Sequence, residues 1–265
     1  MPFVVVVAGQ KGGVGKTTIS TNLFATGTCG DTRGGYSIGM IDADRQGNST
    51  AWAVGAHRFQ ATAGTDGVAA FVSSTGAVAR LADAGEPTSE AARQHMLEVS
   101  RTGGWLVPSN PYLSAGTMAG IRVDLVPVDI LVVDTPPSLP DTVFRSLVGQ
   151  ADVVLCPVQP EPWVLQNVPN LINEIGYAGR GDMLEHGAFR LVLNDVQKTA
   201  GHRAWETVLR AHYGQWLSDV VWPRSPTFQV VAEEGQKYSL KAKPAQLAMA
   251  LWGEIWNTAK RRAAA

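Results

Sequence analysis

A glycine-rich loop with two lysines follows the first apolar run of the chain and constrains its fold more than any other feature. The run covers residues 3–8, and the loop reads Gln10-Lys11-Gly12-Gly13-Val14-Gly15-Lys16-Thr17-Thr18. In the ordinary phosphate loop, a Gly, four residues and Gly-Lys-Ser/Thr wrap phosphates with backbone N–H groups. Gly15, Lys16 and Thr17 complete that pattern, whereas Gln10 replaces its first glycine and a second cation, Lys11, comes next. This order predicts a strand, a phosphate-binding loop and a helix.

The residue types in this loop suit the binding of a phosphate chain. Glycines 12, 13 and 15 allow positive φ angles and a close approach that a side chain would block, and the following helix points the positive end of its dipole at the anion. We expect Lys16 to neutralise the β and γ phosphate oxygens and Thr17 to place its hydroxyl on Mg²⁺. A glycine-rich turn that only links a strand to a helix is the alternative. The preceding strand, the following helix and the two lysines together favour the phosphate site.

Short apolar runs alternate with helical candidates along the chain. Residues 3–8, 37–42, 129–134, 152–157 and 189–194 are dense in Val, Ile and Leu, as strands buried on both faces should be. Helical candidates include residues 16–26, 140–149, 163–177 and 203–212. Strand and helix in turn predict an α/β fold, a doubly wound, mostly parallel sheet with its ligand at the carboxyl ends of the strands. Residues 53–111 are the least readable, and no linker divides the expected single domain 1–265.

Composition agrees with one sizeable soluble domain. The 265 residues are 45% hydrophobic, and no apolar stretch reaches the ~18 residues that a membrane span needs. The N-terminus lacks a basic region before its valine run, so we expect a cytosolic protein. Cys29 and Cys156 have no metal-ligand spacing and are expected to be reduced, buried thiols. A net charge of −1 argues against a protein that coats nucleic acid with its whole surface, but it leaves room for a local basic patch.

Acidic residues stand where the predicted strands end. Asp42 and Asp44 close the run at 38–44, and Asp134 closes the run at 130–134 before Thr-Pro-Pro. A carboxylate at the tip of an apolar strand beside a phosphate loop can hold Mg²⁺ or orient a hydrolytic water. Any one of them could instead cap a helix or form a turn. Their common position beside this loop favours the catalytic and metal interpretation.

Three segments together resemble a known family. The lysine-bearing loop, the stretch Asp42-Ala43-Asp44-Arg45-Gln46-Gly47-Asn48-Ser49-Thr50 and the stretch Val133-Asp134-Thr135-Pro136-Pro137-Ser138-Leu139 are similar to the three nucleotide motifs of ParA-type partition ATPases. These belong to the deviant Walker A group of P-loop NTPases, which includes the MinD cell-division ATPases. Weaker similarity continues in Pro108-Ser109-Asn110, in residues 151–161 and in the C-terminal third.

The resemblance implies roles for the phosphate and metal residues. Lys16 would bind the β and γ phosphates, Thr17 and Asp42 would serve the Mg²⁺ site, and Asp134 would be the acidic residue of the Walker B strand. It also implies a sandwich homodimer that ATP favours over ADP, because Lys11 of each copy would reach the partner's phosphates.

The resemblance further implies slow ATP hydrolysis, with Asp44 positioning the attacking water and Lys11 and Lys16 stabilising charge. Adenine would be held near Asn194 and Pro223. Asn194 could equally be a turn residue at the end of an apolar run.

Non-specific DNA binding would depend on the C-terminal third. Candidate residues are Arg224, Lys237, Lys241 and Lys243, with Lys260, Arg261 and Arg262 at the end of the last helix. Such clusters neutralise DNA phosphates without reading sequence, although a solvated helix face would look the same. The implied function is nucleoid-associated partition of a plasmid or chromosome with a ParB-like adaptor. The loop begins within ten residues of Met1, so we expect no N-terminal helix-turn-helix extension.

The last helix raises a rival interpretation. Its apolar stripe, Leu247, Met249, Leu251, Trp252, Ile255 and Trp256, could resemble the membrane-targeting helix of MinD-like proteins. Packing of a C-terminal helix on the core explains the same stripe and is favoured, because the helix carries few basic residues beside its apolar face. The alternative function is therefore a MinD-like or other cargo-positioning ATPase. An iron-protein reductase, a biosynthetic ligase of the dethiobiotin synthetase type and an inactive scaffold fit the motifs less well.

Overall fold

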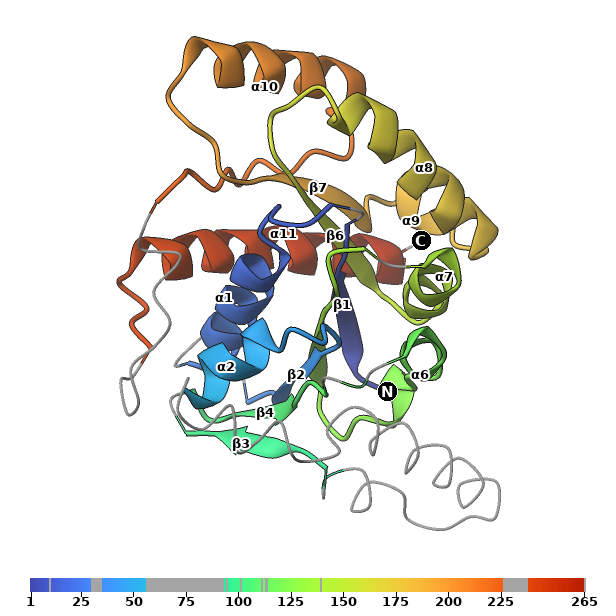
Figure 1. Cartoon of the computed structure of the whole chain (residues 1–265), viewed down its shortest axis with the longest axis vertical. Helices are drawn as coiled ribbons and strands as arrows, with labels where there is room; N and C mark the ends of the chain where they lie inside the picture. Colours follow the sequence, from blue (N-terminus) through green and yellow to red (C-terminus); the bar gives the residue numbers. More distant parts are fainter. Residues whose placement is uncertain are drawn as a thin grey trace.

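A twisted sheet forms the centre of the molecule (Figure 1). The structure, a computed structural model, describes residues 1–9, 11–29, 35–55, 93, 95–100, 102–110, 112, 114–138, 140–225 and 238–264. In this part of the chain the strands are β1 (Phe3–Val7), β2 (Ile38–Asp42), β3 (Leu97–Val99), β4 (Gly104–Val107), β5 (Ile130–Asp134), β6 (Val153–Val158) and β7 (Phe189–Leu193). Their order across the sheet is β3-β4-β2-β5-β1-β6-β7.

All neighbouring strands are parallel except β3, which runs antiparallel to β4 at one edge. The residues of β2, β5 and β6 are buried throughout, as are Val4–Val7 of β1. Because these strands are covered on both faces, the side chains that point to either face are shielded from water. This explains why both sets are rich in Val, Ile and Leu. The α/β fold with a doubly wound, mostly parallel sheet is confirmed.

Helices cover both faces of the sheet (Figure 1). One face carries α1 (Lys16–Thr28), α2 (Asn48–Val54) and α11 (Lys243–Ala264). The other carries α6 (Ala115–Ala119), α7 (Asp141–Gly149), α8 (Val164–Tyr177), α9 (Asp182–Glu185) and α10 (Ala200–Tyr213); the short 3-10 helix η2 (Val123–Leu125) precedes β5. In β1, Val5 and Val7 face the α1 side and Val4 and Val6 face the other, as the two-residue period of a strand requires.

The C-terminal helix α11 packs on α1, and its apolar stripe is part of the core. Ala248, Leu251 and Ile255 are buried, and the indole Nε1 of Trp252 donates a hydrogen bond to the Leu23 carbonyl at 3.0 Å. Of the stripe, Leu251, Trp252 and Ile255 are buried, whereas Leu247, Met249 and Trp256 are half-buried. The centre of the stripe therefore packs on the core, as the core-packing interpretation predicts. No helix in the described ranges combines the length and the apolar character needed to cross a bilayer.

The expected elements agree with the structure to within three residues at each end. The helices expected at 140–149 and 163–177 begin one residue later, because Pro140 and Trp163 occupy the N-cap positions. The strands β3 and β4 lie in the range 53–111, most of which falls outside the described residues. The expectation of two buried thiols is half right: Cys156 is buried in β6, whereas Cys29 at the C-cap of α1 is half-buried.

Candidate nucleotide site

The predicted site residues meet at the carboxyl edge of the sheet. Asp42 and Asp134 are the last residues of β2 and β5, which are neighbouring parallel strands, and they pair in register. Asp134 also pairs with Val7 at the end of β1, from which the chain enters the glycine-rich loop. The loop then leads into α1 at Lys16 (Figure 1). Sheet order alone therefore brings three separate sequence motifs to one edge.

The loop has the backbone that its glycines predict. Gly13 and Gly15 have φ angles of 74° and 94°, in the left-handed region that disfavours other residues. A Cβ at Gly15 would also lie 2.1 Å from Nδ2 of Asn194, so no side chain fits there. Gly15 is the N-cap of α1 and no side chain caps that helix, which leaves its first N–H groups available to an anion.

Lys16 curls back over the loop. Its Nζ donates a hydrogen bond to the Lys11 carbonyl at 2.9 Å, and the residue is 6% exposed. Burial lowers the pKa of Lys16 from its ordinary value, and the nearby Asp134 carboxylate opposes that effect. The ammonium group thus sits inside the loop, where a phosphate would replace its carbonyl partner.

Asp134 is fully buried and surrounded by hydroxyl groups. It accepts hydrogen bonds from Thr17 at 2.9 Å, Ser20 at 3.0 Å and Ser49 at 2.5 Å. Burial raises its pKa, and these hydrogen bonds pull it in the opposite direction. Ser20 on α1 was missed by the sequence analysis, and Ser49 on α2 was included only as part of the motif at 42–50. Their hydroxyls connect both helices to this carboxylate.

Asp42 and Asp44 hold the segment that links β2 to α2. Asp42 accepts hydrogen bonds from the backbone N–H and the hydroxyl of Thr50, both at 2.7 Å. Burial, followed by the negative charge of Asp134, raises the pKa of Asp42 to about 8. Asp44 accepts a hydrogen bond from the Gln46 N–H at 3.0 Å, and its carbonyl accepts one from the Ser109 hydroxyl. Asp44 therefore has a local turn role, one of the alternatives considered, at a position beside the loop.

Side chains at this edge have the donor set that Mg²⁺ prefers. The buried carboxylate of Asp134 accepts a hydrogen bond from the Thr17 hydroxyl, and it neighbours the second buried carboxylate, Asp42. The two carboxylates repel each other unless a cation or proton intervenes. Within the described ranges, no group of three or more His, Cys, Asp or Glu side chains could hold a metal ion by itself. Mg²⁺ commonly takes one or two carboxylates together with water and substrate phosphates. The residues present therefore fit a metal shared with a phosphate chain.

Lys11, the second lysine of the loop, points away from the phosphate cradle. Its Nζ lies 3.0 Å from Oε2 of Glu161 and 4.6 Å from the centre of the Trp163 ring. Its side chain is 43% exposed, so it sits at the rim of the site. Glu161 and Trp163 follow β6, which pairs with β1.

Asn194 braces the loop from β7. Its Nδ2 donates to the Val14 carbonyl at 2.8 Å, and its backbone N–H donates to the Val158 carbonyl at 2.8 Å. Pro223 lies nearby, because it forms an isolated bridge with Val196. Asn194 thus directly follows β7 at the end of the apolar run and contacts the phosphate loop.

The basic candidates of the C-terminal third have different surroundings. Arg224 forms a two-pronged ion pair with Asp195, at 2.6 and 2.7 Å, beside Asn194. Lys243 is exposed at the start of α11, Lys241 is exposed two residues before that helix, and Lys260 is exposed near its end. Lys237 and the side chains of Arg261 and Arg262 lie outside the described residues.

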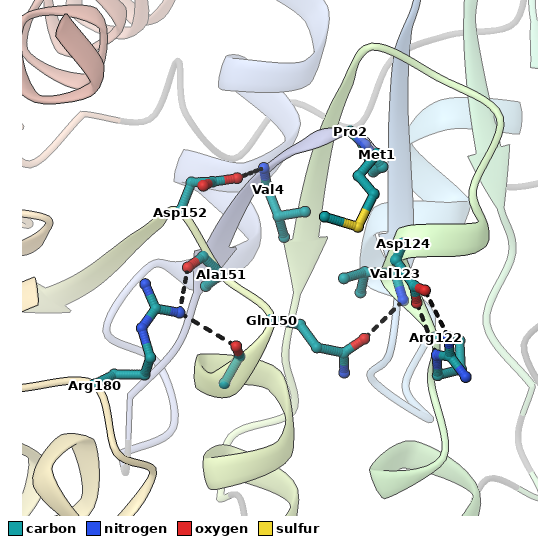
Figure 2. Close-up of a pocket in the computed structure, with 11 residues that line it drawn as sticks. Met1, Pro2, Val4, Arg122, Val123, Asp124, Gln150, Ala151, Asp152 and Arg180 are labelled. Carbon is teal, nitrogen blue, oxygen red and sulfur yellow. Dashed lines mark hydrogen bonds and ion pairs between the residues drawn. The ribbon is translucent and has the colours of Figure 1, made fainter. Parts of the chain in front are cut away.

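A cavity of about 660 Å³ lies near the amino end of β1, on the side of the sheet opposite the carboxyl ends of the strands (Figure 2). Met1, Val4 and Asp152 line it near the start of β1. Its charged groups have protein partners: Arg180 donates to Ala151, and Asp152 accepts from the Val4 N–H. The cavity is thus separated from the candidate nucleotide site by the length of β1.

Comparison with known proteins gives a consistent result. The chromosome partitioning protein ParA of Caulobacter vibrioides is 28% identical over 277 residues, covering 98% of this chain and 96% of that protein. The maintenance of carboxysome distribution protein A of Halothiobacillus neapolitanus is 28% identical, covering 78% and 73%. A putative plasmid partition protein of Borrelia burgdorferi bound to AMPPNP has a similar fold, with a TM-score of 0.66 at 15% identity over 96% and 98% of the two chains.

A family model described as an AAA domain, AAA_31, matches residues 3–180. The match includes the loop, both aspartate motifs and the segment of Glu161 and Trp163. Because it covers more than half of the chain, the chain belongs to the AAA_31 family and, within it, to the ParA-type ATPases of the ParA/MinD group.

Proposed function

We propose that this chain, as a single ATPase domain spanning residues 1–265, is an ATP-driven switch for DNA partition. It binds ATP and Mg²⁺, forms a homodimer with ATP, binds DNA non-specifically and moves a plasmid or chromosome with a ParB-like adaptor on the nucleoid. The observation that carries the proposal is the division of labour between the two lysines: Lys16 lies inside the loop, whereas Lys11 lies at its exposed rim. Because Lys11 lies at the exposed rim, its ammonium group could contact the phosphates bound by a second copy of the chain.

Binding of the phosphate chain is assigned to the loop and α1. The backbone N–H groups of residues 12–18 bind the phosphates, and Lys16 exchanges the Lys11 carbonyl for the β and γ oxygens. Thr17 would hold Mg²⁺, with Asp42 and Asp134 behind it, and the ion would supply positive charge to the phosphates. The hydroxyls of Ser20 and Ser49 keep Asp134 in place when Thr17 turns away from it.

Hydrolysis requires a placed water molecule and little covalent help. Asp44 is assigned this placement, because its carboxylate is attached to the short turn between β2 and α2 and that turn is held to the β4 side by Ser109. Lys11 adds positive charge to the partner's phosphates, which stabilises the transition state and the dimer by the same contact. Turnover is expected to be slow, as the resemblance to ParA-type ATPases implies.

Adenine is assigned to the region of Asn194 and Pro223. The brace from Asn194 to Val14 ties this region to the loop, so base and phosphates would contact one continuous surface. The ion pair of Arg224 with Asp195 borders the same region. Arg224 thus has a structural role here, which leaves the DNA assignment to depend more on Lys237, Lys241 and Lys243.

DNA binding is proposed to be electrostatic. Exposed lysines at and just before the start of α11 can neutralise phosphates through counterion release. A net charge of −1 makes a single copy a weak DNA binder, and two copies double the number of basic side chains on one particle. Dimerisation by ATP would in this way control DNA affinity.

The second candidate is a positioning ATPase that acts on a protein cargo. The relative named for maintenance of carboxysome distribution favours it. A membrane-directed version is disfavoured, because the centre of the apolar stripe of α11 is buried in the core and Trp252 is hydrogen-bonded to α1.

The experiment that tests the proposal measures binding to random-sequence duplex DNA with ATP, with ADP and without nucleotide, at two salt concentrations. Salt-sensitive binding with ATP alone is expected. Nucleotide binding and light scattering of variants then separate the steps. Lys16→Ala should no longer bind nucleotide. Lys11→Ala should bind ATP but stay a monomer, and Asp44→Ala should form a dimer with ATP. A monomeric Asp44→Ala protein in ATP would contradict the switch, and ATP-dependent dimers without DNA binding would favour the protein-cargo candidate.

A further inference from the structure

Lys11 is held by its own subunit through two separate contacts. It forms an ion pair with Glu161 at 3.0 Å, and its ammonium group lies over the Trp163 ring at 4.6 Å. The two partners are also joined to each other, because the Trp163 Nε1 donates to the same Oε2 of Glu161 at 2.6 Å. Cation, carboxylate and indole therefore form a closed three-membered cluster at the rim of the loop.

The two partners of Lys11 are attached to a fixed point in the fold. Trp163 is the N-cap residue of α8, and it packs partly against the buried cluster on that face of the sheet. The Val164 N–H donates to the Glu161 carbonyl at 3.2 Å, which fixes the turn before the helix. The cluster therefore has a stationary half, at 161–163, and a half that belongs to the nucleotide loop.

Glu161 is a charged partner at neutral pH. The hydrogen bond from Lys11 is the main cause that lowers the pKa of Glu161, and His202 on α10 adds a smaller contribution of the same sign. The side chains of Lys11 and Glu161 remain 43% and 38% exposed. Contacts of this kind are individually weak, so the cluster can hold Lys11 without preventing its release.

Residue 11 also connects the cluster to the phosphate site. The backbone carbonyl of Lys11 accepts the hydrogen bond from Lys16 Nζ at 2.9 Å. A phosphate that binds the Lys16 ammonium group would replace this hydrogen bond. Lys11 would then lose a restraint on its backbone when ATP occupies the loop.

We propose that Glu161 and Trp163 are positioning residues that store Lys11 against its own subunit until ATP and a second copy compete for it. The inference rests on the proposed function, in which Lys11 acts across a homodimer. Formation of the dimer then exchanges a carboxylate in the same chain for phosphate in the partner. The stored state makes dimerisation weaker than it would be with a free lysine, which protects the free chain from pairing before ATP is bound.

The first measurement is the dimer dissociation constant of the full chain with AMPPNP, by sedimentation equilibrium. Glu161→Gln should lower it about threefold to tenfold, the size expected from losing an exposed ion pair and weakening a cation–π contact. Trp163→Phe keeps an aromatic face but loses the N–H bond to Glu161, and it should give a smaller decrease. The matched control is Glu206→Gln, which breaks the exposed Glu206–Arg210 pair on α10 and should change nothing.

Two further measurements separate storage from a general structural effect. In a Lys11→Ala background, Glu161→Gln should no longer alter dimerisation. The second measurement follows the indole N–H resonance of Trp163, which is identified by its loss in Trp163→Phe. Relative to the nucleotide-free wild-type chain, this resonance should shift in Lys11→Ala and also on addition of AMPPNP to the wild type.

The outcomes distinguish the two proposals. Absence of any AMPPNP dimer in the wild-type chain would overturn the proposed function and the storage role with it. A wild-type dimer whose dissociation constant is unchanged or increased in Glu161→Gln would overturn storage alone, as would an indole resonance that ignores Lys11.

Discussion

Replacement of Gly15 by alanine tests whether the loop and β7 fit as closely as the structure shows. The new Cβ would lie 2.1 Å from Nδ2 of Asn194, and the residue would keep a φ of 94°. Left-handed backbone costs a residue with a Cβ about 1–2 kcal/mol. Moving Asn194 aside breaks its buried bond to the Val14 carbonyl, at a cost of about 1–3 kcal/mol. Alanine recovers about 0.4–1 kcal/mol through the unfolded chain, so Gly15→Ala should lose about 1–5 kcal/mol.

The assay is thermal unfolding without nucleotide, in which this loss should lower the Tm by roughly 2–20 °C. Gly253→Ala is the matched control, because that glycine lies inside α11 with open space around it and should gain up to about 1 kcal/mol. The double variant Gly15→Ala, Asn194→Ala should lose less than the sum of the two single variants, since it removes the clash. A Gly15→Ala protein as stable as the wild type, or strictly additive losses, would refute the reasoning.

Three other predictions test the surrounding fold. Arg180→Ala removes hydrogen bonds to three carbonyls at the end of α7 and should lower the Tm by about 4–8 °C, whereas Arg203→Ala, on the exposed face of α10, should change it little. Trp252→Phe removes the bond to a carbonyl of α1 and should cost about 1–2 kcal/mol in urea unfolding. Burial raises the pKa of the Cys156 thiol to about 12, so a thiol reagent at pH 8 should label at most Cys29 in the native chain and both cysteines after unfolding.

Long apolar runs made most of the fold predictable. The strands β1, β2, β5, β6 and β7 each contain five or six residues with almost continuous burial, and each is followed by a helix or a turn. The strands β3 and β4 have three and four residues, too few to display a period. Gly104 also weakens the strand signal of β4, yet packing requires it: a Cβ there would lie within 2.7 Å of Phe24 and Thr28 on α1.

The residues at the carboxyl edge of the sheet were predictable because they lie in contiguous sequence motifs. The contacts between different motifs were not predictable from the sequence. Asp42, Asp44 and Asp134 were found because each ends or follows an apolar strand. The hydroxyl groups around Asp134 come from α1 and α2, and their convergence depends on how those helices pack. The contact of Lys11 with Glu161 joins residues 150 positions apart, and only the pairing of β1 with β6 brings their loops together.

The groups assigned to nucleotide already have internal partners. Lys16 donates to a loop carbonyl, Thr17 donates to Asp134, and Lys11 pairs with Glu161. Under the proposed function, ATP therefore exchanges contacts instead of adding them, and the net gain from each is smaller than its gross strength. Each exchange releases a group on a different segment: the loop, the Asp134 cluster and the turn before α8. A ligand shifts a conformational equilibrium only as far as it interacts differently with the two states, and these exchanges are where that difference would arise.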